Sequence, residues 1–291
     1  MKKNSQNATI VTKVFRIVVC LFLCFLAIVP FYMLVINSTL THDKIATGIR
    51  LIPGSNFVNN FKAMFDKKKQ IVTSYNIFQA FRNSLIITIP TTIIQIYFGA
   101  LTAYAVTVYK FKGRNLAWGF IYGIMMIPTQ LSIVGMMAVM KTIGWYGTRK
   151  VLIALILPAM AAPSTVYFMK QYMESALPLE IIEAGRIDGS SEFRTFNLIA
   201  IPMIKPAMAT QAIFGFVASW NNLYTPSMLI GAQRDLSTLP MYAMSIRAED
   251  KNPDLGQTYA AMLVAILPII VAYLFLSKYI IAGVSLGGVK E

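Results

Sequence analysis

Residues 183–206, EAGRIDGSSEFRTFNLIAIPMIKP, decide how the rest of this chain is interpreted. The segment is a polar interruption between two long apolar stretches, and an Asp188-Gly189 pair lies in its first half. Glycine ends a helix at little cost because it adopts a positive φ angle readily. The pattern therefore predicts a helix-turn-helix with its bend at Gly189.

The two arms of this predicted hairpin carry signals of their own. Pro178 suits the first turn of the first helix, where its missing N–H costs no hydrogen bond. Ser190 or Ser191 is suited to cap the second helix, which Pro202 and Pro206 are expected to end before the next apolar stretch. Both arms have apolar residues at helical spacing: Leu179, Ile182, Ile187, Phe193, Phe196 and 198–201. Such a hairpin either rests on lipid head groups or is held by another protein.

The composition is that of a membrane protein. Of the 291 residues, 56% are hydrophobic and 13% are charged, whereas soluble domains have about 25% charged residues. The mean hydropathy is +0.61. The net charge of +14 fits basic loops that face anionic lipid head groups. No basic run is interleaved with aromatic residues, so we expect no nucleic-acid partner.

Six apolar stretches approach or exceed the length that crosses a hydrocarbon core of about 30 Å. We predict transmembrane helices at 15–37, 83–109, 117–139, 151–169, 207–230 and 259–277. The first is longer than a signal-peptide core and no small-residue cleavage site follows it, so we interpret it as uncleaved. The expected fold class is an all-α polytopic membrane protein.

Six spans place both termini on one side of the membrane. The predicted organisation is an N-terminal tail of residues 1–14, a six-helix domain of residues 15–283 and a C-terminal tail of residues 284–291, with connecting loops at 38–80, 174–205 and 231–256. Loop charge hardly orients this arrangement, because it divides the 26 lysines and arginines equally between the two faces. The run Lys67–Lys69 lies far from either neighbouring span, and the cations at 2, 3, 13 and 16 flank the first span. Both facts favour termini on the cytoplasmic side.

Apart from Arg16 at the edge of the first, the six apolar stretches contain no Asp, Glu, Lys, Arg or His. Ionisable residues at membrane depth mark proton relays and ion pathways, so their absence argues against a proton-coupled transporter or a cation channel. A sodium-coupled carrier that uses carbonyl ligands stays open. We expect no metal site, because Cys20 and Cys24 lie inside the first span and His42 has no ligand partners at suitable spacing.

The fifth span is the most polar. It contains Ser219, Trp220, Asn221, Asn222 and Tyr224. Uncharged amides, hydroxyls and aromatic rings suit a neutral polyol such as a sugar, so these residues are candidates for a substrate pathway. The alternative is that they join neighbouring helices, as polar residues often do in lipid.

The chain resembles the membrane-spanning permease subunits of binding-protein-dependent ABC importers. The family signature is E-A-A, three residues, G, nine residues and I-x-L-P; this chain has Glu183-Ala184-Gly185, then Gly189, then Ile199-Ala200-Ile201-Pro202. Gly185 and Ile201 depart from the signature, and Gly185 is expected to weaken the first helix by about 1 kcal/mol relative to alanine. The segments RIDGSSEFRTF, SWNNLYTPSMLI and IAGVSLGGVKE are similar to the carbohydrate-uptake branch, in particular to MalG-like permeases.

This resemblance implies a six-helix type I importer fold in a bacterial-type cell membrane, with both termini cytoplasmic. It also implies a second homologous permease, two cytoplasmic ATPase subunits, an extracytoplasmic sugar-binding protein and contact with membrane lipid. The chain itself would be no enzyme and hold no cofactor, because ATP and Mg²⁺ are bound by the ATPase subunits. By matching position, the residues expected at the ATPase interface are Glu183, Ala184, Gly185, Arg186, Asp188 and Gly189.

Two other function classes stay open from the sequence. One is an importer of the same architecture for polyamines, phosphate or amino acids, although the spans lack the acidic residues that would suit polyamines. The other is a structural membrane protein with no ATPase partner.

Overall fold

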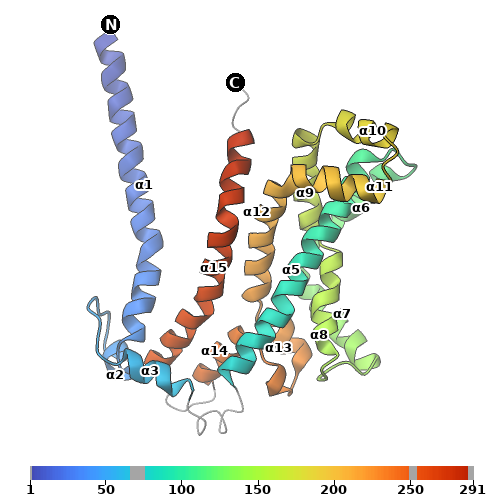
Figure 1. Cartoon of the computed structure of the whole chain (residues 1–291). Coiled ribbons are helices and arrows are strands. Elements are labelled where there is room, and N and C mark those ends of the chain that lie inside the picture. The colour runs from blue at the N-terminus through green and yellow to red at the C-terminus, as the bar shows by residue number, and fades with distance from the viewer. Residues whose placement is uncertain (1, 66–75, 249–253, 288–291) are drawn as a thin grey trace. The chain divides into compact units, whose positions relative to one another are not determined.

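The computed structural model describes residues 2–65, 76–248 and 254–287, and the regular secondary structure in these ranges is helical (Figure 1). The Lys67–Lys69 run, residues 249–253 of the predicted loop 231–256 and residues 288–291 of the predicted tail lie outside the described residues. The chain divides into two compact units: residues 1–73 with 243–265, and residues 74–242 with 266–291. Helices α14 (Leu239–Ala248) and α15 (Leu255–Gly287) each contribute residues to both units.

The first unit contains α1 (Lys2–Ser38), α2 (His42–Ala46) and α3 (Phe57–Ala63), so the predicted loop 38–80 includes two short helices. The side-chain amide of Asn60 donates to the carbonyl oxygens of Ser38 and Leu40, both at 2.8 Å. The first bond satisfies a carbonyl group that the end of α1 leaves without a partner inside the helix, and the second holds the chain just after it. The candidate span Thr12–Ser38 has a mean hydropathy of 2.8 in its most apolar part, none of which is buried. This part of α1 therefore presents an apolar surface that suits lipid or a second membrane protein.

The second unit is organised around three helices that lie side by side, α5 (Ile77–Val108), α9 (Pro163–Ala176) and α12 (Ile201–Trp220) (Figure 1). Ala100 and Ala103 of α5 are fully buried, and such small residues let membrane helices pack closely. Near the middle of α5, the side-chain amide of Gln95 donates to the hydroxyl of Thr165 on α9 at 2.7 Å. Up to α14, the second unit also contains α6 (Arg114–Met125), α7 (Thr129–Thr142), α8 (Val151–Ile156), η1 (Leu157–Met160), α10 (Leu179–Ile187), α11 (Glu192–Thr195), η2 (Phe196–Ala200), α13 (Tyr224–Ile230) and η3 (Arg234–Leu236).

Contacts with distant parts of the sequence fix both ends of α5. Near its start, the amide of Asn83 donates to the backbone carbonyls of Asp235 at 2.8 Å and Ser237 at 3.0 Å. Just past its other end, the hydroxyl of Tyr109 donates to a carboxylate oxygen of Glu192 at 2.7 Å. At a rise of 1.5 Å per residue, about 39 Å of helix separates Asn83 from Tyr109. The η3 segment and the α10–α11 segment therefore lie at opposite ends of a helix that is longer than a hydrocarbon core.

Among the described residues, five helical stretches are long and apolar enough to span a membrane, and α6 with α7 forms a sixth candidate that is bent by 94°. Pro128, at the start of α7, lies at this bend. α6 begins shortly after Tyr109, whereas Met140 of α7 packs with Leu229 and Leu236 at the opposite end of α5. The pair therefore runs from one end of the unit to the other, which supports a broken span rather than a re-entrant loop. The prediction of six spans holds on this count, but residues 117–139 form two helices.

The predicted fifth span, 207–230, is wrong at both ends. Pro202 and Pro206 do not end a helix, because a continuous helical stretch runs from Glu192 to Trp220. It passes through the π-helical turn η2, in which the N–H of Ile201 donates to the carbonyl of Phe196. A π turn re-registers the hydrogen bonds just before Pro202, which has no N–H to donate. At the other end, helix α12 ends at Trp220, and α13 is a separate helix.

The helices also extend beyond the charge-free stretches predicted from the sequence. Lys170 of α9 is buried, forms an ion pair with Glu174 one turn later and lies 4.4 Å from the ring centroid of Trp118 on α6. Burying a lysine is costly unless the charge is paired, and here a carboxylate and an aromatic face both stabilise it.

Candidate functional site

The predicted helix-turn-helix is present as α10, a turn and α11 (Figure 1). Pro178 precedes the first helical residue, Leu179. Ile182 is fully buried and belongs to the same apolar core as Phe196 of η2 and Ile204 of α12. This core fixes the hairpin to the end of the three long helices.

The turn between the arms has the hydrogen bonds of a Schellman motif. Gly189 has a φ angle of 77°, which glycine adopts without strain. The N–H of Gly189 donates to the carbonyl of Arg186, and the N–H of Ser190 donates to the carbonyl of Gly185, both at 3.0 Å. The predicted bend at Gly189 is therefore confirmed. Ser191 occupies the cap position of α11, but its hydroxyl makes no capping hydrogen bond.

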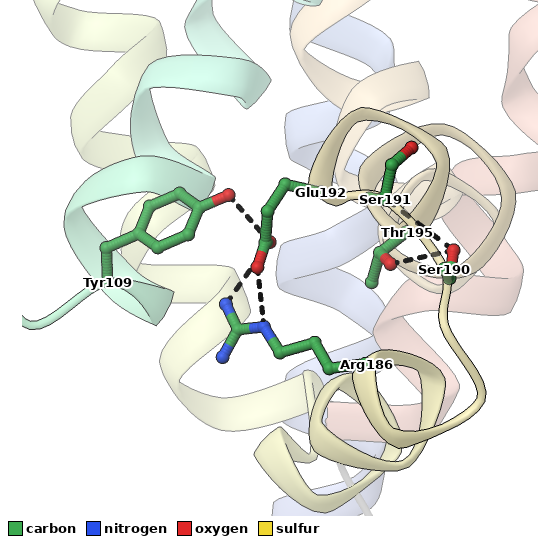
Figure 2. Close-up of polar contacts among 6 residues, drawn as sticks. All are labelled: Tyr109, Arg186, Ser190, Ser191, Glu192 and Thr195. Atoms are coloured by element: carbon green, nitrogen blue, oxygen red, sulfur yellow. Dashed lines mark hydrogen bonds and ion pairs between the residues drawn. The ribbon is translucent and has the colours of Figure 1, made fainter.

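Three side chains, Tyr109, Arg186 and Glu192, join the two arms to the end of α5, and we call them the hairpin clamp (Figure 2). Arg186 donates from Nε to Oε1 of Glu192 at 2.7 Å and from Nη2 to Oε2 at 3.2 Å. The Tyr109 hydroxyl donates to the same Oε2 at 2.7 Å. The guanidinium carbon of Arg186 lies 5.5 Å from the centroid of the Tyr109 ring. The clamp thus combines a forked ion pair, a hydrogen bond and a cation–π contact.

The electrostatics of the clamp keep its donors protonated. The hydrogen bond with the Glu192 carboxylate raises the pKa of Arg186 above its usual range. Burial and the hydrogen bond to Glu192 raise the pKa of Tyr109 to about 12. Both groups therefore remain hydrogen-bond donors at neutral pH.

A further hydrogen bond connects α11 to the turn. The hydroxyl of the buried Thr195 donates to Ser190 Oγ at 3.0 Å (Figure 2).

Gly185, which replaces the second alanine of the signature, is buried where α10 meets η2. A Cβ atom placed on Gly185 would lie 2.8 Å from Cδ1 of Ile199. Ile199 is itself a signature position. Glycine at this position therefore leaves space for the Ile199 side chain. The packing of Ile199 against α10 offsets the helix stability that glycine is expected to cost.

The predicted interface residues divide into two groups. Glu183, Ala184, Asp188 and Gly189 are exposed, whereas Gly185 is buried and Arg186 is partly covered in the hairpin clamp. Two large apolar side chains are exposed beside the first group, Ile187 at 86% and Phe193 at 66%. The hairpin thus has an inward face that holds it in place. Its outward face carries the carboxylates of Glu183 and Asp188 and the apolar side chains of Ile187 and Phe193.

Sequence reasoning missed two residues that shape this site, Tyr109 and Glu192. Glu192 had a local signal, because an acidic residue suits the first turn of a helix. Tyr109 had none, since it lies 83 positions from Glu192 and only the fold brings the two together.

The substrate-pathway candidates lie where α12 ends and α13 begins, at the end of the unit opposite the hairpin. Trp220 is 1% exposed; it stacks on Phe216 and meets Phe81 of α5 edge-on. Ser219 donates to the Thr88 hydroxyl at 3.3 Å, and the side chain of Asn222 accepts from the N–H of Thr225 at 3.1 Å. These three side chains are engaged within the chain, whereas Asn221 and Tyr224 are exposed.

The arrangement of the hairpin suits docking, because its outward face is apolar and carboxylate-bearing and its inward face is tightly fixed. Among the described residues, no three His, Cys, Asp or Glu side chains are grouped so that they could hold a metal ion.

Residues 95–285 match the family described as "binding-protein-dependent transport system inner membrane component". The chain belongs to this family. The matched range includes the hairpin clamp, the signature positions and the pathway candidates. The resemblance inferred from residues 183–202 is therefore confirmed.

Curated relatives match along nearly the whole chain. The arabinooligosaccharides transport system permease protein AraQ of Halalkalibacterium halodurans is 32% identical over 273 residues, 92% of this chain and 93% of the relative. The melibiose/raffinose/stachyose import permease protein MelC of Bacillus subtilis is 29% identical over 99% of this chain and 98% of its own. The maltodextrin transport system permease protein MdxG of the same organism is 29% identical over 98% of this chain and 100% of its own.

A solved structure shows the same fold. The chain covers 96% of a chain in the crystal structure of a bacterial ABC transporter involved in the import of the acidic polysaccharide alginate. The match covers 92% of this chain with a TM-score of 0.73 and 19% sequence identity. This family member is thus a membrane-spanning transport component with an ABC importer permease fold, as expected from the sequence, and not an enzyme.

Proposed function

We propose that this chain forms half of the translocation pathway of an ATP-driven importer for a sugar or oligosaccharide. The hairpin of α10 and α11 would dock on a cytoplasmic ATPase and pass its movements to the membrane helices. The observation that carries this proposal is the two-sided hairpin. Its inward face is fixed to α5 and α12 by the hairpin clamp and by Ile182, while Ile187 and Phe193 face outward.

This construction fits a mechanical role. A surface that transmits force must be rigid within itself and joined firmly to the element it moves. Because the hairpin clamp contacts the C-terminal end of α5, a displacement of α10 would be transmitted to the core of the second unit. Glu183, Ala184 and Asp188 would contact the ATPase, with Gly189 making the bend and Gly185 and Arg186 holding it.

The remaining parts of the complex follow from this role. A second homologous permease would complete the pathway, two ATPase subunits would bind ATP and Mg²⁺, and an extracytoplasmic binding protein would deliver the substrate. Docking on an intracellular ATPase places the hairpin, and with six spans both termini, on the cytoplasmic side. The apolar surface of α1 would face lipid or the second permease.

A saccharide is the favoured substrate class because the relatives AraQ, MelC and MdxG are described as transporting or importing arabinooligosaccharides, melibiose and related sugars, and maltodextrin. Asn221 and Tyr224 are the pathway candidates whose side chains remain exposed, so they are the first to test for contact with the substrate.

Co-purification tests the proposed function directly. The tagged chain is expressed in its native cells and extracted in mild detergent, and the accompanying proteins are identified by mass spectrometry. We expect a second permease and an ATPase, and ATP-dependent sugar uptake after reconstitution with the binding protein. A chain that purifies without an ATPase, or a complex that imports a non-saccharide in preference, contradicts the proposal.

A further inference from the structure

A cluster of positive charge lies next to the hairpin clamp. The turn between α5 and α6 carries three cations, Lys110, Lys112 and Arg114, and it directly follows Tyr109 of the clamp. Lys110 and Lys112 are exposed, and Arg114 is partly exposed. Among the described residues, no carboxylate forms an ion pair with any of the three. We call residues 110–116 the cationic loop.

The sequence supplies no compensating negative charge near the cationic loop. Residues 67–173 contain neither Asp nor Glu. Glu192, which the fold brings to Tyr109, is already paired with Arg186. The three charges of the loop therefore repel one another, and an anionic partner would relieve that repulsion.

The cationic loop also forms a shaped and ordered surface. Residues 110–116 line a surface depression of about 460 Å³. The turn is fixed by Gly113, whose φ angle of 87° suits glycine, and by the hydrogen bond from the N–H of Arg114 to the carbonyl of Phe111 at 3.3 Å. A surface that is ordered before it meets a partner loses less entropy on binding.

Aromatic contacts hold α6 against α9 one turn after the cationic loop. Trp118 stacks on Tyr167 of α9 with ring centroids 5.9 Å apart, and the ammonium group of Lys170 lies 4.4 Å from the centroid of the Trp118 ring. Tyr122 meets the same tyrosine at 5.9 Å. Tryptophan and tyrosine are enriched at the head-group level of membranes. These rings therefore indicate that the cationic loop lies at the membrane–water interface.

The surface that borders the cationic loop is apolar. Leu116 is 79% exposed and Phe120 is 68% exposed. Residues four positions apart lie on one face of a helix, so these two side chains form an apolar face that starts at the loop itself. An exposed apolar face on a membrane-spanning segment suits lipid. The combination of cations with this face favours a lipid over the acidic surface of a water-soluble partner.

We propose that the cationic loop binds the head group of an anionic phospholipid. The usual excess of cations at the cytoplasmic ends of membrane helices accounts for the sign of the charge, but not for the depression, the apolar border and the fixed aromatic rings. Because Lys110 follows Tyr109 directly, a bound lipid would hold the end of α5 at the clamp that fixes the hairpin.

The membrane leaflet follows from the length of α5. About 39 Å of helix separates Asn83 from Tyr109, so the cationic loop and the hairpin share one end of the second unit. The inference rests on the proposed function for the choice of leaflet alone, since a cytoplasmic hairpin places the lipid in the cytoplasmic leaflet. Anionic lipids of that leaflet attract basic segments that lie next to membrane helices.

The test uses the full chain with its co-purified partners in lipid nanodiscs. Phosphatidylglycerol and phosphatidylcholine probes that carry the same photoreactive group near the head group are compared, and labelled peptic peptides are identified by mass spectrometry. In the parent, we expect phosphatidylglycerol to label the peptide containing residues 110–116 about fivefold more than phosphatidylcholine does. Lys110→Gln/Lys112→Gln/Arg114→Gln should abolish this preference, whereas the charge-conserving variant Lys110→Arg/Lys112→Arg/Arg114→Lys should keep it.

A matched control removes three exposed cations from the predicted loop 38–80 of the first unit, with Lys44→Gln/Arg50→Gln/Lys62→Gln; it should keep the preference. Equal labelling of the parent by both probes overturns the inference. So does an equal loss of preference in the control, which would indicate attraction by net charge alone, and so does full competition by inorganic phosphate, which would indicate a site for the free anion.

Two further outcomes separate the possible partners. If the cationic-loop variant Lys110→Gln/Lys112→Gln/Arg114→Gln loses ATPase binding in neutral lipid while the parent shows no preference for phosphatidylglycerol, the loop belongs to the ATPase interface and the lipid inference is wrong. Labelling requires no ATPase. A missing preference therefore contradicts this inference alone, whereas a chain that purifies without an ATPase contradicts the proposed function alone.

Discussion

Tyr109 and Glu192 are separated by 83 positions in the sequence, yet the tyrosine hydroxyl donates a 2.7 Å hydrogen bond to the glutamate carboxylate (Figure 2). This bond joins the C-terminal end of α5 to the first residue of α11. It also orients the carboxylate that accepts a hydrogen bond from Arg186 of α10. One carboxylate therefore links three elements at the point where the hairpin meets the membrane helices.

The first prediction concerns this bond. Tyr109→Phe removes the hydroxyl and keeps the ring under Arg186, so it should lower the free energy of unfolding by about 1 kcal/mol and reduce the transport obtained per ATP hydrolysed. Thermal unfolding in detergent and paired uptake and ATPase assays measure the two effects. Tyr122→Phe on α6, where the side chain is half exposed, is the matched control. Unaltered stability and coupling in Tyr109→Phe would show that the bond is dispensable.

A second prediction addresses the Arg186–Glu192 pair. Both side chains are partly exposed, so solvent weakens the ion pair and the expected interaction energy is at most about 1 kcal/mol. In a double-mutant cycle of Arg186→Gln and Glu192→Gln, the double variant should be less destabilised than the two single variants added together. Arg186→Lys should rescue little, because an ammonium group cannot reproduce the forked contact with the carboxylate. Strict additivity would show that the two residues act independently.

The third prediction concerns Gly185. Alanine at a helix interior is favoured over glycine by about 1 kcal/mol, but here the added Cβ lies 2.8 Å from Cδ1 of Ile199. Gly185→Ala should therefore change stability little, and Gly185→Ala/Ile199→Val should recover part of the gain. Gly119→Ala on α6, where nothing lies within 4 Å of the added Cβ, should be stabilising. A gain for Gly185→Ala equal to that for Gly119→Ala would contradict the packing argument.

The Gly185 case illustrates what local sequence reasoning can and cannot provide. The spans, the bend at Gly189 and the family were predicted because each depends on residues close together in the chain: apolar runs, an Asp-Gly pair and a signature of 20 positions. The cost assigned to Gly185 was incomplete because the compensating neighbour, Ile199, belongs to another element. Tyr109 was not found for the same reason, at a much larger separation.

The fifth span shows a different limit. Proline usually ends a helix, so Pro202 and Pro206 predicted a break between the hairpin and the span. The structure instead absorbs Pro202 with the π turn η2 and continues to Trp220. The predicted span also continued past Trp220 to Ile230, whereas α12 ends at Trp220. A new helix, α13, follows, and the side chain of Asn222 accepts from the N–H of Thr225 in its first turn. Both errors come from hydrogen-bond patterns that composition does not specify.

The fourth prediction separates packing from substrate contact among the pathway candidates. Trp220 is buried between Phe81 and Phe216, so Trp220→Ala should destabilise the chain by about 3–5 kcal/mol. Asn221→Ala and Tyr224→Ala should leave the unfolding temperature unchanged, because both side chains are exposed. If these two residues line the pathway, sugar uptake falls in both variants while the complex stays intact. Normal uptake in both would remove them from the pathway and leave only helix packing for this segment.

The final prediction tests the outward face of the hairpin. Glu183 and Glu180 are exposed on the same helix, three positions apart, but only Glu183 occupies the first signature position. Glu183→Ala should leave the unfolding temperature unchanged and weaken ATPase binding by about tenfold or more, as expected for a charged residue at the centre of an interface. Glu180→Ala is the matched control, because it removes the same charge from the first turn of α10. Binding of the purified ATPase to each variant in nanodiscs gives the comparison. Equal losses for both variants would indicate a general electrostatic effect, and full ATPase binding by Glu183→Ala would remove this carboxylate from the docking surface.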